Sequence, residues 1–226
     1  MKVYDCVQGE PEWFNVRAGV LTASNAASVV TVARLQPAKF GAYAHKLIAE
    51  RILRRPIDTT PDTGWMERGR EMEPKARAWL ASPTQLDVDI EEVGFCKSDD
   101  GRVGFSPDGF YADRTVGVEL KTGAAHTHVG YALDPDLFVK AHAMQPQFSM
   151  WVSGIETWQL VSWNPRIEPV VITLKRDQRY MDAFDEHVPA FLARVDEAVQ
   201  RLTALRMGMD PDDMTEEDAA AALVFG

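Results

Sequence analysis

The sequence predicts a mixed α/β (α+β) fold, with helices first, then a mixed β-sheet with a crossover helix, then a long closing helix. Two patterns support this prediction. Apolar residues recur at helical spacing in the first third of the chain and near its end, whereas short β-branched and aromatic runs fill the middle. We expect one domain over residues 1–206, followed by an acidic tail over residues 207–226.

The expected helices are amphipathic segments bounded by capping residues or prolines. They cover residues 12–30 (two short helices around a turn at Ala18-Gly19), 40–54, 65–80, 137–153 and about 177–205. The expected strands are short runs rich in Val, Ile and aromatic residues. They cover residues 86–97, 102–106, 116–121, 157–163 and 169–175.

The composition is that of an ordinary globular chain, with 46% hydrophobic and 26% charged residues. No apolar run approaches the roughly 20 residues that span a bilayer, and the N-terminus lacks the apolar core of a signal peptide. Cys6 and Cys96 have no metal-ligand spacing. We therefore expect a cytoplasmic protein with free thiols and no membrane partner.

The net charge of −10 argues against a protein that simply coats DNA. Six of the acids lie in the tail, which contains no base, so residues 1–206 carry only −4. A nucleic-acid contact would therefore need a local basic strip.

Three charged residues lie in or beside a segment apolar enough to be buried: Asp108, Glu119 and Lys121. A buried carboxylate costs several kcal/mol unless it is paired, hydrogen-bonded or bound to a metal. Residues two apart on a strand share a face, so Glu119 and Lys121 point the same way. The following loop is long enough to bring Asp108 beside Glu119.

Two converging carboxylates favour a hard cation such as Mg²⁺ or Mn²⁺. A neighbouring lysine can hold an attacking water or stabilise charge on a phosphate. The alternative interpretation is a strand with an exposed Glu–Lys pair.

Pro107-Asp108, a spacer and Glu119-x-Lys121 form the signature of the PD-(D/E)xK nuclease superfamily. Six blocks in order resemble the YqaJ-like viral recombinase family, to which phage lambda exonuclease belongs. They are 13-WFNVRAGVLTASNAASV-29, 68-RGREMEPKAR-77, 105-FSPDGFYADRTVGVELK-121, 144-MQPQFSMWV-152, 162-SWNPR-166 and 180-YMDAFDEHVPAF-191. The resemblance implies a restriction-endonuclease-like PD-(D/E)xK core, a mixed central sheet flanked by helices.

The resemblance also implies roles for individual residues. Asp108, Glu119 and the main-chain carbonyl of Leu120 would bind metal, Glu73 would complete the metal site, and Lys121 would position or activate the attacking water.

A second group of residues matches a pocket for a 5′-phosphate, namely Arg17, Ser24, Ser106 and Gln145. A guanidinium with hydroxyl and amide donors suits a phosphate. The sequence departs from the family over residues 122–140, and Pro146 directly follows Gln145. His126 and His128 alternate like residues on a strand, but no third zinc ligand lies nearby, so we expect them in a loop near the mouth of the site.

The resemblance implies a 5′→3′ exonuclease that depends on Mg²⁺, with two ions and Mn²⁺ as a substitute. It would act on linear double-stranded DNA with 5′-phosphorylated ends, release 5′-mononucleotides and leave a 3′ single strand for recombination. It further implies a homotrimer that encircles DNA, a single-strand annealing protein as partner, and a phage or prophage origin. The alternatives are a structure-specific or restriction-type endonuclease on the same core, and a non-catalytic module that binds DNA ends.

Overall fold

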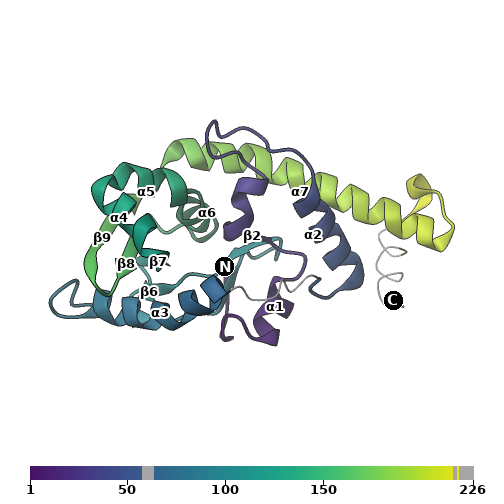
Figure 1. Cartoon of the computed structure of the whole chain (residues 1–226). Helices are drawn as coiled ribbons and strands as arrows, with labels where there is room; N and C mark the ends of the chain where they lie inside the picture. The colour runs from purple at the N-terminus through teal and green to yellow at the C-terminus, as the bar shows by residue number, and fades with distance from the viewer. Residues whose placement is uncertain (58–63, 216–217, 219–226) are drawn as a thin grey trace.

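The computed structural model describes residues 1–57, 64–215 and 218 (Figure 1). Its mixed α/β architecture confirms the predicted fold class, but the strands form two sheets rather than one. The four-stranded sheet has the order β1 (Lys2–Tyr4), β4 (Phe95–Lys97), β5 (Val103–Phe105) and β2 (Leu21–Thr22). The five-stranded sheet has the order β3 (Ile90–Glu91), β6 (Gly109–Tyr111), β7 (Val116–Lys121), β8 (Thr157–Asn164) and β9 (Ile167–Lys175).

Each sheet is mixed. In the first, β2 pairs parallel with β5, and in the second, β7 pairs parallel with β8. A parallel pair needs a crossover connection, and between β7 and β8 this connection is helical. It consists of α4 (Ala125–Leu133), α5 (Pro135–His142) and α6 (Met144–Ser153).

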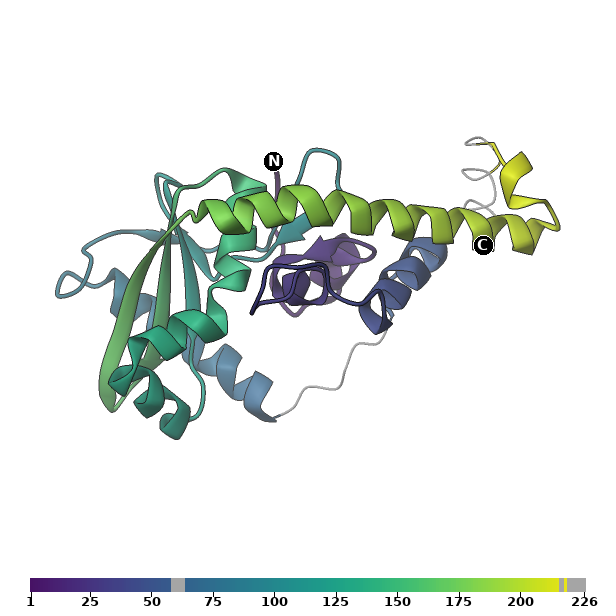
Figure 2. The same ribbon diagram turned by 90° about the horizontal axis from the view of Figure 1, so that it is seen from above.

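The remaining helices are α1 (Pro11–Arg17), the 3₁₀ helix η1 (Ala23–Ser28), α2 (Ala42–Leu53), α3 (Gly64–Ala81), α7 (Gln178–Met207) and the 3₁₀ helix η2 (Pro211–Asp213). The long helix α7 follows β9 and runs along the molecule to α2 (Figure 2), and it packs against α6 and α2. Met181, Phe184, Val188 and Leu192 recur at helical spacing on its buried face. None of the described helices is long and apolar enough to cross a membrane.

Several predicted elements differ from the structure. The second helix predicted within residues 12–30 is instead β2 followed by η1, where side chains of Thr22, Ser24 and Asn25 hydrogen-bond to one another and compete with helical structure. The helix predicted over residues 137–153 is two helices, because Pro146 lies in the first turn of α6, where its missing N–H has no intrahelical partner to lose.

Strand β6 and helix α4 were not predicted. Strand β6 is only three residues long and lies within the segment expected to be a loop after Asp108. Helix α4 contains His126 and His128, so the prediction of a loop there is wrong. Of the predicted acidic tail, residues 216–217 and 219–226 lie outside the described residues.

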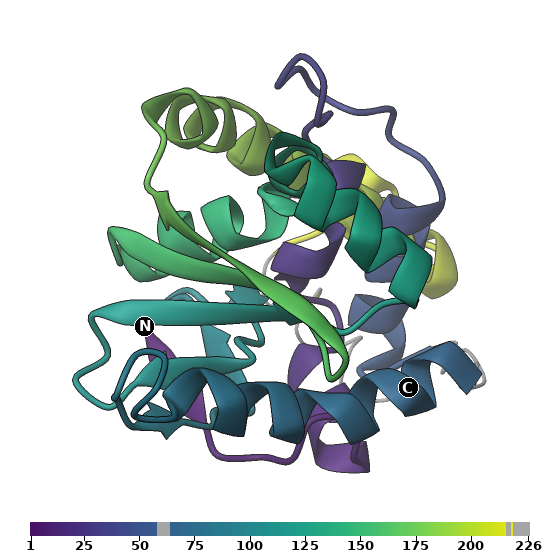
Figure 3. The same cartoon turned by 60° about the vertical axis from the view of Figure 1, so that its left-hand side comes forward.

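The two sheets meet through aromatic side chains. The rings of Phe105, Phe110 and Trp158, from β5, β6 and β8, pack edge to face with centroids between 5.8 and 6.2 Å apart. All three are fully buried. Helix α3 covers the opposite side of the five-stranded sheet from α4 and α6 (Figure 3), where Ala76 and Leu80 pack on the apolar residues of β7 and β8.

At Gly117 in β7 the backbone lies close against this aromatic cluster. Its register partner on β8 is Trp158, and a Cβ atom at Gly117 would lie 2.4 Å from atoms of the Trp158 ring. Because the ring is buried on all sides, it has no space into which to move.

We predict that Gly117→Ala destabilises the protein by about 1–3 kcal/mol through overpacking against Trp158. Gly130→Ala in α4 is the matched control, because a Cβ there meets no atom within 4 Å and alanine favours a helix. Urea unfolding of both variants checks this, and equal stability of the two proteins would contradict the packing argument.

Candidate active site

Glu119 and Lys121 share one face of β7, as their spacing predicted. Lys121 Nζ lies 2.5 Å from Glu119 Oε1, and the Glu119 side chain is only 2% exposed. Gln145 on α6 donates from Nε2 to the other carboxylate oxygen, Glu119 Oε2, at 2.9 Å. The lysine is thus held by a buried carboxylate instead of extending into solvent.

Asp108 lies in the turn between β5 and β6, and its carboxylate is tied to β7. Its N–H donates to Val118 O at 3.1 Å, and Leu120 N donates to Asp108 Oδ2 at 2.5 Å. The predicted loop that returns the chain to Glu119 is in fact the antiparallel β6–β7 hairpin. A hairpin fixes the relation between Asp108 and Glu119 more rigidly than a loop, because backbone hydrogen bonds hold its two strands in register.

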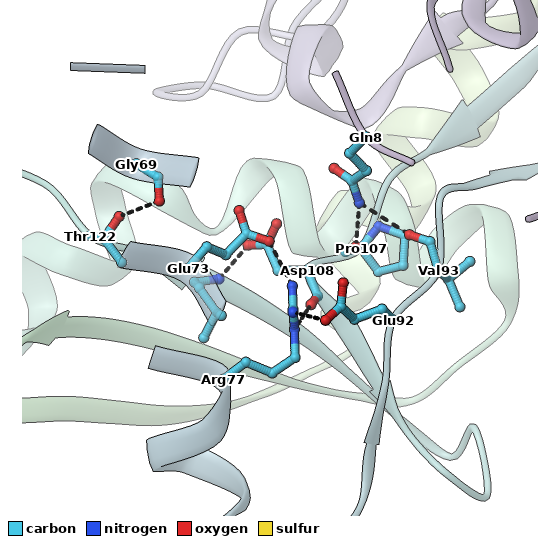
Figure 4. Close-up of polar contacts among 10 residues, drawn as sticks. Gln8, Gly69, Glu73, Arg77, Glu92, Val93, Pro107, Asp108 and Thr122 are labelled. Carbon is cyan, nitrogen blue, oxygen red and sulfur yellow. Dashed lines mark hydrogen bonds and ion pairs between the residues drawn. The ribbon is translucent and has the colours of Figure 1, made fainter. Parts of the chain in front are cut away.

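The backbone of the Pro107-Asp108 turn is clamped from outside the sheet. Gln8 Nε2 donates to Pro107 O at 2.9 Å and to Val93 O at 3.1 Å (Figure 4). This turn carries both Asp108 and, two residues earlier, Ser106. Its fixed backbone therefore sets the positions of two predicted site residues.

Glu73 approaches the Asp108 turn from α3 (Figure 4). Arg77, one helical turn later, donates from Nη2 to Glu73 Oε1 at 2.8 Å and from Nε to Asp108 O at 2.8 Å. It also forms an ion pair with Glu92. Arg77 lies in the quoted block RGREMEPKAR, and its i, i+4 spacing from Glu73 is the one sequence signal that could have identified it.

Ionisation of the carboxyl groups in this cluster is unfavourable. Burial raises the pKa of Glu119 to about 7, and the charge of Asp108 adds to the rise, whereas Lys121 opposes it. Burial and the neighbouring Asp108 likewise raise the pKa of Glu73 to about 7. The pKa of Asp108 is also raised, chiefly by burial. Each group therefore favours a compensating positive charge.

The donor set fits a hard divalent cation. Within the described part of the chain, no three His, Cys, Asp or Glu side chains are gathered closely enough to form a metal site by themselves. Among the described residues, none donates a hydrogen bond to Asp108 Oδ1 or Glu73 Oε2. Carboxylate oxygens with a main-chain carbonyl, such as that of Leu120, suit Mg²⁺ or Mn²⁺.

Arg17 provides a buried positive charge in the same cleft. Its guanidinium carbon lies 3.7 Å from the centre of the Trp13 ring, and among the described residues its buried Nε has no hydrogen-bond partner. Burial lowers the pKa of Arg17 to about 10, so the group stays charged at neutral pH. Trp13 Nε1 also donates to Ser106 Oγ at 2.9 Å, so one indole contacts two of the predicted phosphate-binding residues.

A tight turn after α1 fixes where Arg17 lies. Gly19 has φ +70, and Glu50 Oε2 accepts its N–H at 2.9 Å while Arg51 Nε donates to its carbonyl at 2.9 Å. A Cβ on Gly19 would lie 2.8 Å from the Arg51 side chain. The position thus requires glycine for both its conformation and its space.

One cleft of about 1340 Å³ contains both the predicted metal-binding residues and the predicted phosphate-binding residues. All the predicted site residues line it: Arg17, Ser24, Glu73, Ser106, Asp108, Glu119, Leu120, Lys121 and Gln145. Gln145 contacts the carboxylate Glu119, so within the cleft it lies at the predicted metal site.

Two histidines also line this cleft, His142, to which the sequence assigned no role, and His128, which was expected near the mouth of the site. His142 Nε2 lies 2.9 Å from Tyr131 Oη, and burial lowers the pKa of His142 to about 4, with a contribution from Lys121. His128 is buried with both ring nitrogens in hydrogen bonds, to Ser162 Oγ and to a main-chain carbonyl. It therefore anchors α4 to the sheet and has no nitrogen left for a metal.

The raised pKa values predict how the metal-free protein responds to pH. A carboxyl whose folded pKa exceeds its unfolded value stabilises the fold below about pH 4.5 and loses that contribution as pH rises through about 7. In EDTA, the wild type should therefore lose on the order of 2 kcal/mol relative to Glu119→Gln between pH 5 and pH 8.

Chemical unfolding at both pH values measures this difference, whatever constant offset the substitution introduces. Mg²⁺ should reduce the loss by binding the ionised carboxylate. Glu168→Gln on the exposed edge of β9 is the control and should keep the wild-type pH profile. Parallel pH profiles of wild type and Glu119→Gln in EDTA would contradict the prediction.

The chain is similar to known proteins in sequence and in fold. The YqaJ-like viral recombinase domain matches residues 12–156. The ExoD protein of Escherichia coli (strain K12) is 34% identical over 65 residues, which are 27% of this chain and 75% of that protein.

Solved exonuclease structures share the fold. LHK-Exo in complex with dAMP superposes with a TM-score of 0.75 at 26% identity, over 88% of this chain and 99% of its own. LHK-Exo from Laribacter hongkongensis, described as an alkaline exonuclease, gives 0.72 at 25% identity, with the same coverage. A phage related exonuclease from Haemophilus somnus 129PT gives 0.63 at 11% identity over 81% and 96% of the two chains, which shows the fold alone.

These matches confirm the PD-(D/E)xK nuclease fold and the resemblance seen in the sequence. Because the family domain covers more than half of the chain and includes the Asp108, Glu119 and Lys121 cluster, the chain belongs to the YqaJ-like viral recombinase family.

Proposed function

We propose that the chain is a Mg²⁺-dependent 5′→3′ exonuclease that acts on the ends of linear double-stranded DNA. It would prefer a 5′-phosphate, release 5′-mononucleotides and leave a 3′ single strand for annealing-type recombination. The family and the fold support a nuclease. The observation that carries the finer proposal is the single cleft in which the buried guanidinium of Arg17 and the carboxylate–lysine cluster lie together.

The carboxylate end of the cleft suits phosphodiester hydrolysis. Asp108, Glu119, Glu73 and the carbonyl of Leu120 would hold Mg²⁺, two ions in our proposal, which supplies an acidified water and charge neutralisation at the phosphate. Lys121, held in place by Glu119, would orient the attacking water and stabilise the negative charge that builds up on the phosphate oxygens.

The arginine end suits a terminal phosphate. The buried Nε of Arg17 has no hydrogen-bond partner within the described structure, and Ser24 and Ser106 add hydroxyl groups. Anchoring the 5′-phosphate there would place the next phosphodiester at the carboxylates. This spacing would give 5′→3′ polarity and single-nucleotide products. The complex of LHK-Exo with dAMP, a 5′-mononucleotide, supports a product of this kind.

The proposal includes a homotrimeric ring around DNA and a single-strand annealing protein as partner, in a phage or prophage setting. A ring would explain how a chain with net charge −10 stays on DNA, because enclosure of the duplex reduces the need for a strong electrostatic grip.

We predict that Lys121→Ala lowers the rate by about 10²–10⁴-fold, measured on linear duplex DNA with a labelled 5′-phosphate. Wild-type protein should release labelled mononucleotides with Mg²⁺ and none with EDTA. A closed circular duplex is the control substrate and should remain intact. Nicking of the circle would favour an endonuclease, and no cleavage with any metal would leave only an end-binding module.

We predict that Arg17→Gln removes the preference for phosphorylated ends. The loss of a charge-assisted contact should cost about 10- to 100-fold on 5′-phosphate ends, with little change on 5′-hydroxyl ends. Rates on the two duplexes, differing only in the terminal phosphate, measure the ratio. An unchanged ratio would place the phosphate elsewhere.

A further inference from the structure

We propose that Arg77 is a positioning residue of the metal site. Its guanidinium would hold the Glu73 carboxylate and the main chain of Asp108 in the arrangement that a divalent cation needs. This inference rests on the proposed function, because it takes Glu73 and Asp108 as ligands of the cation.

The contacts of Arg77 join three separate segments (Figure 4). Nη2 donates to Glu73 on its own helix at 2.8 Å, Nε donates to the carbonyl of Asp108 in the turn before β6 at 2.8 Å, and Nη1 pairs with Glu92 between β3 and β4. The residue itself is only 9% exposed. The Arg77 guanidinium thus contacts the carboxylate of one predicted ligand, Glu73, and the main-chain carbonyl of another, Asp108.

Glu73 is the carboxylate that most needs such support. Its side chain is 29% exposed, against 2% for Glu119. A partly exposed glutamate samples several rotamers, and ordering it on metal binding costs conformational entropy. The hydrogen bond from Arg77 restricts Glu73 beforehand to one conformation, and the same guanidinium binds the carbonyl of Asp108.

Charge alone does not explain an arginine at this position. A guanidinium next to a cation site repels the cation, so an arginine that acted only through its charge would weaken metal binding. Geometry explains its presence instead. A planar guanidinium has five N–H donors in a fixed fork and can reach three acceptors at once, whereas a lysine ammonium is compact and cannot span them. The two roles therefore predict metal affinities that change in opposite directions when Arg77 is replaced.

The test measures Mn²⁺ binding to the 226-residue protein in the absence of DNA. Electron paramagnetic resonance of the free ion is the readout. We expect Arg77→Gln to bind Mn²⁺ about 10- to 100-fold more weakly than wild type, and Arg77→Lys to fall between them. Arg179→Gln is the matched control, because Arg179 donates two hydrogen bonds to the Asp177 carboxylate on the exposed surface. It should bind Mn²⁺ as wild type does.

Unchanged or tighter Mn²⁺ binding by a folded Arg77→Gln protein would overturn the inference. So would an equal loss in Glu92→Gln, because the effect would then depend on the outer carboxylate and not on Glu73 and Asp108. If Arg77→Gln fails to fold, Arg77→Lys decides the question. An Arg77→Lys protein that unfolds at the same temperature as wild type must still bind Mn²⁺ more weakly.

Asp108→Asn separates this inference from the proposed function. If Asp108→Asn binds Mn²⁺ as tightly as wild type, the proposed metal site itself is wrong. If Asp108→Asn loses the ion and Arg77→Gln keeps it, the metal site stands and only the role of Arg77 fails.

Discussion

The candidate site depends on one electrostatic constraint, the accumulation of carboxylates at a buried end of the five-stranded sheet. Glu119 is buried and Asp108 is half-buried in the same cluster, and the charge of Asp108 raises the pKa of both Glu119 and Glu73. Partial compensation comes from Lys121 on Glu119, from the Leu120 N–H on Asp108 and from Arg77 on Glu73. The negative charge that remains is the driving force for binding a divalent cation, because burial strengthens the attraction.

The fold is arranged to hold these charges rigidly. The β6–β7 hairpin sets Asp108 against Glu119, α3 brings Glu73 from one side of the sheet, and α6 brings Gln145 from the other. Behind the site, the aromatic cluster of Phe105, Phe110 and Trp158 joins the two sheets into one core. A tightly packed core of this kind resists small displacements, which a constellation of metal ligands requires.

The other end of the cleft follows a different principle. There the guanidinium of Arg17 is buried against Trp13 without a carboxylate partner in the described structure. An arginine kept unpaired in this way retains its hydrogen-bonding capacity for an anion. The net charge of the chain gives no hint of this pocket, because one buried guanidinium changes the local field while hardly affecting the total.

The sequence by itself determined the parts that rest on short-range regularity. The period of two on a strand placed Glu119 and Lys121 on one face, and apolar residues at helical spacing located α2, α3 and α7 within a few residues. The quoted blocks identified the family. Only the tertiary structure showed β6, α4, the contact of Gln145 with Glu119, and the roles of Arg77 and Trp13 as partners of site residues. These contacts join residues 26, 31 and 93 positions apart, and no local periodicity encodes them, because they exist only when distant segments pack together.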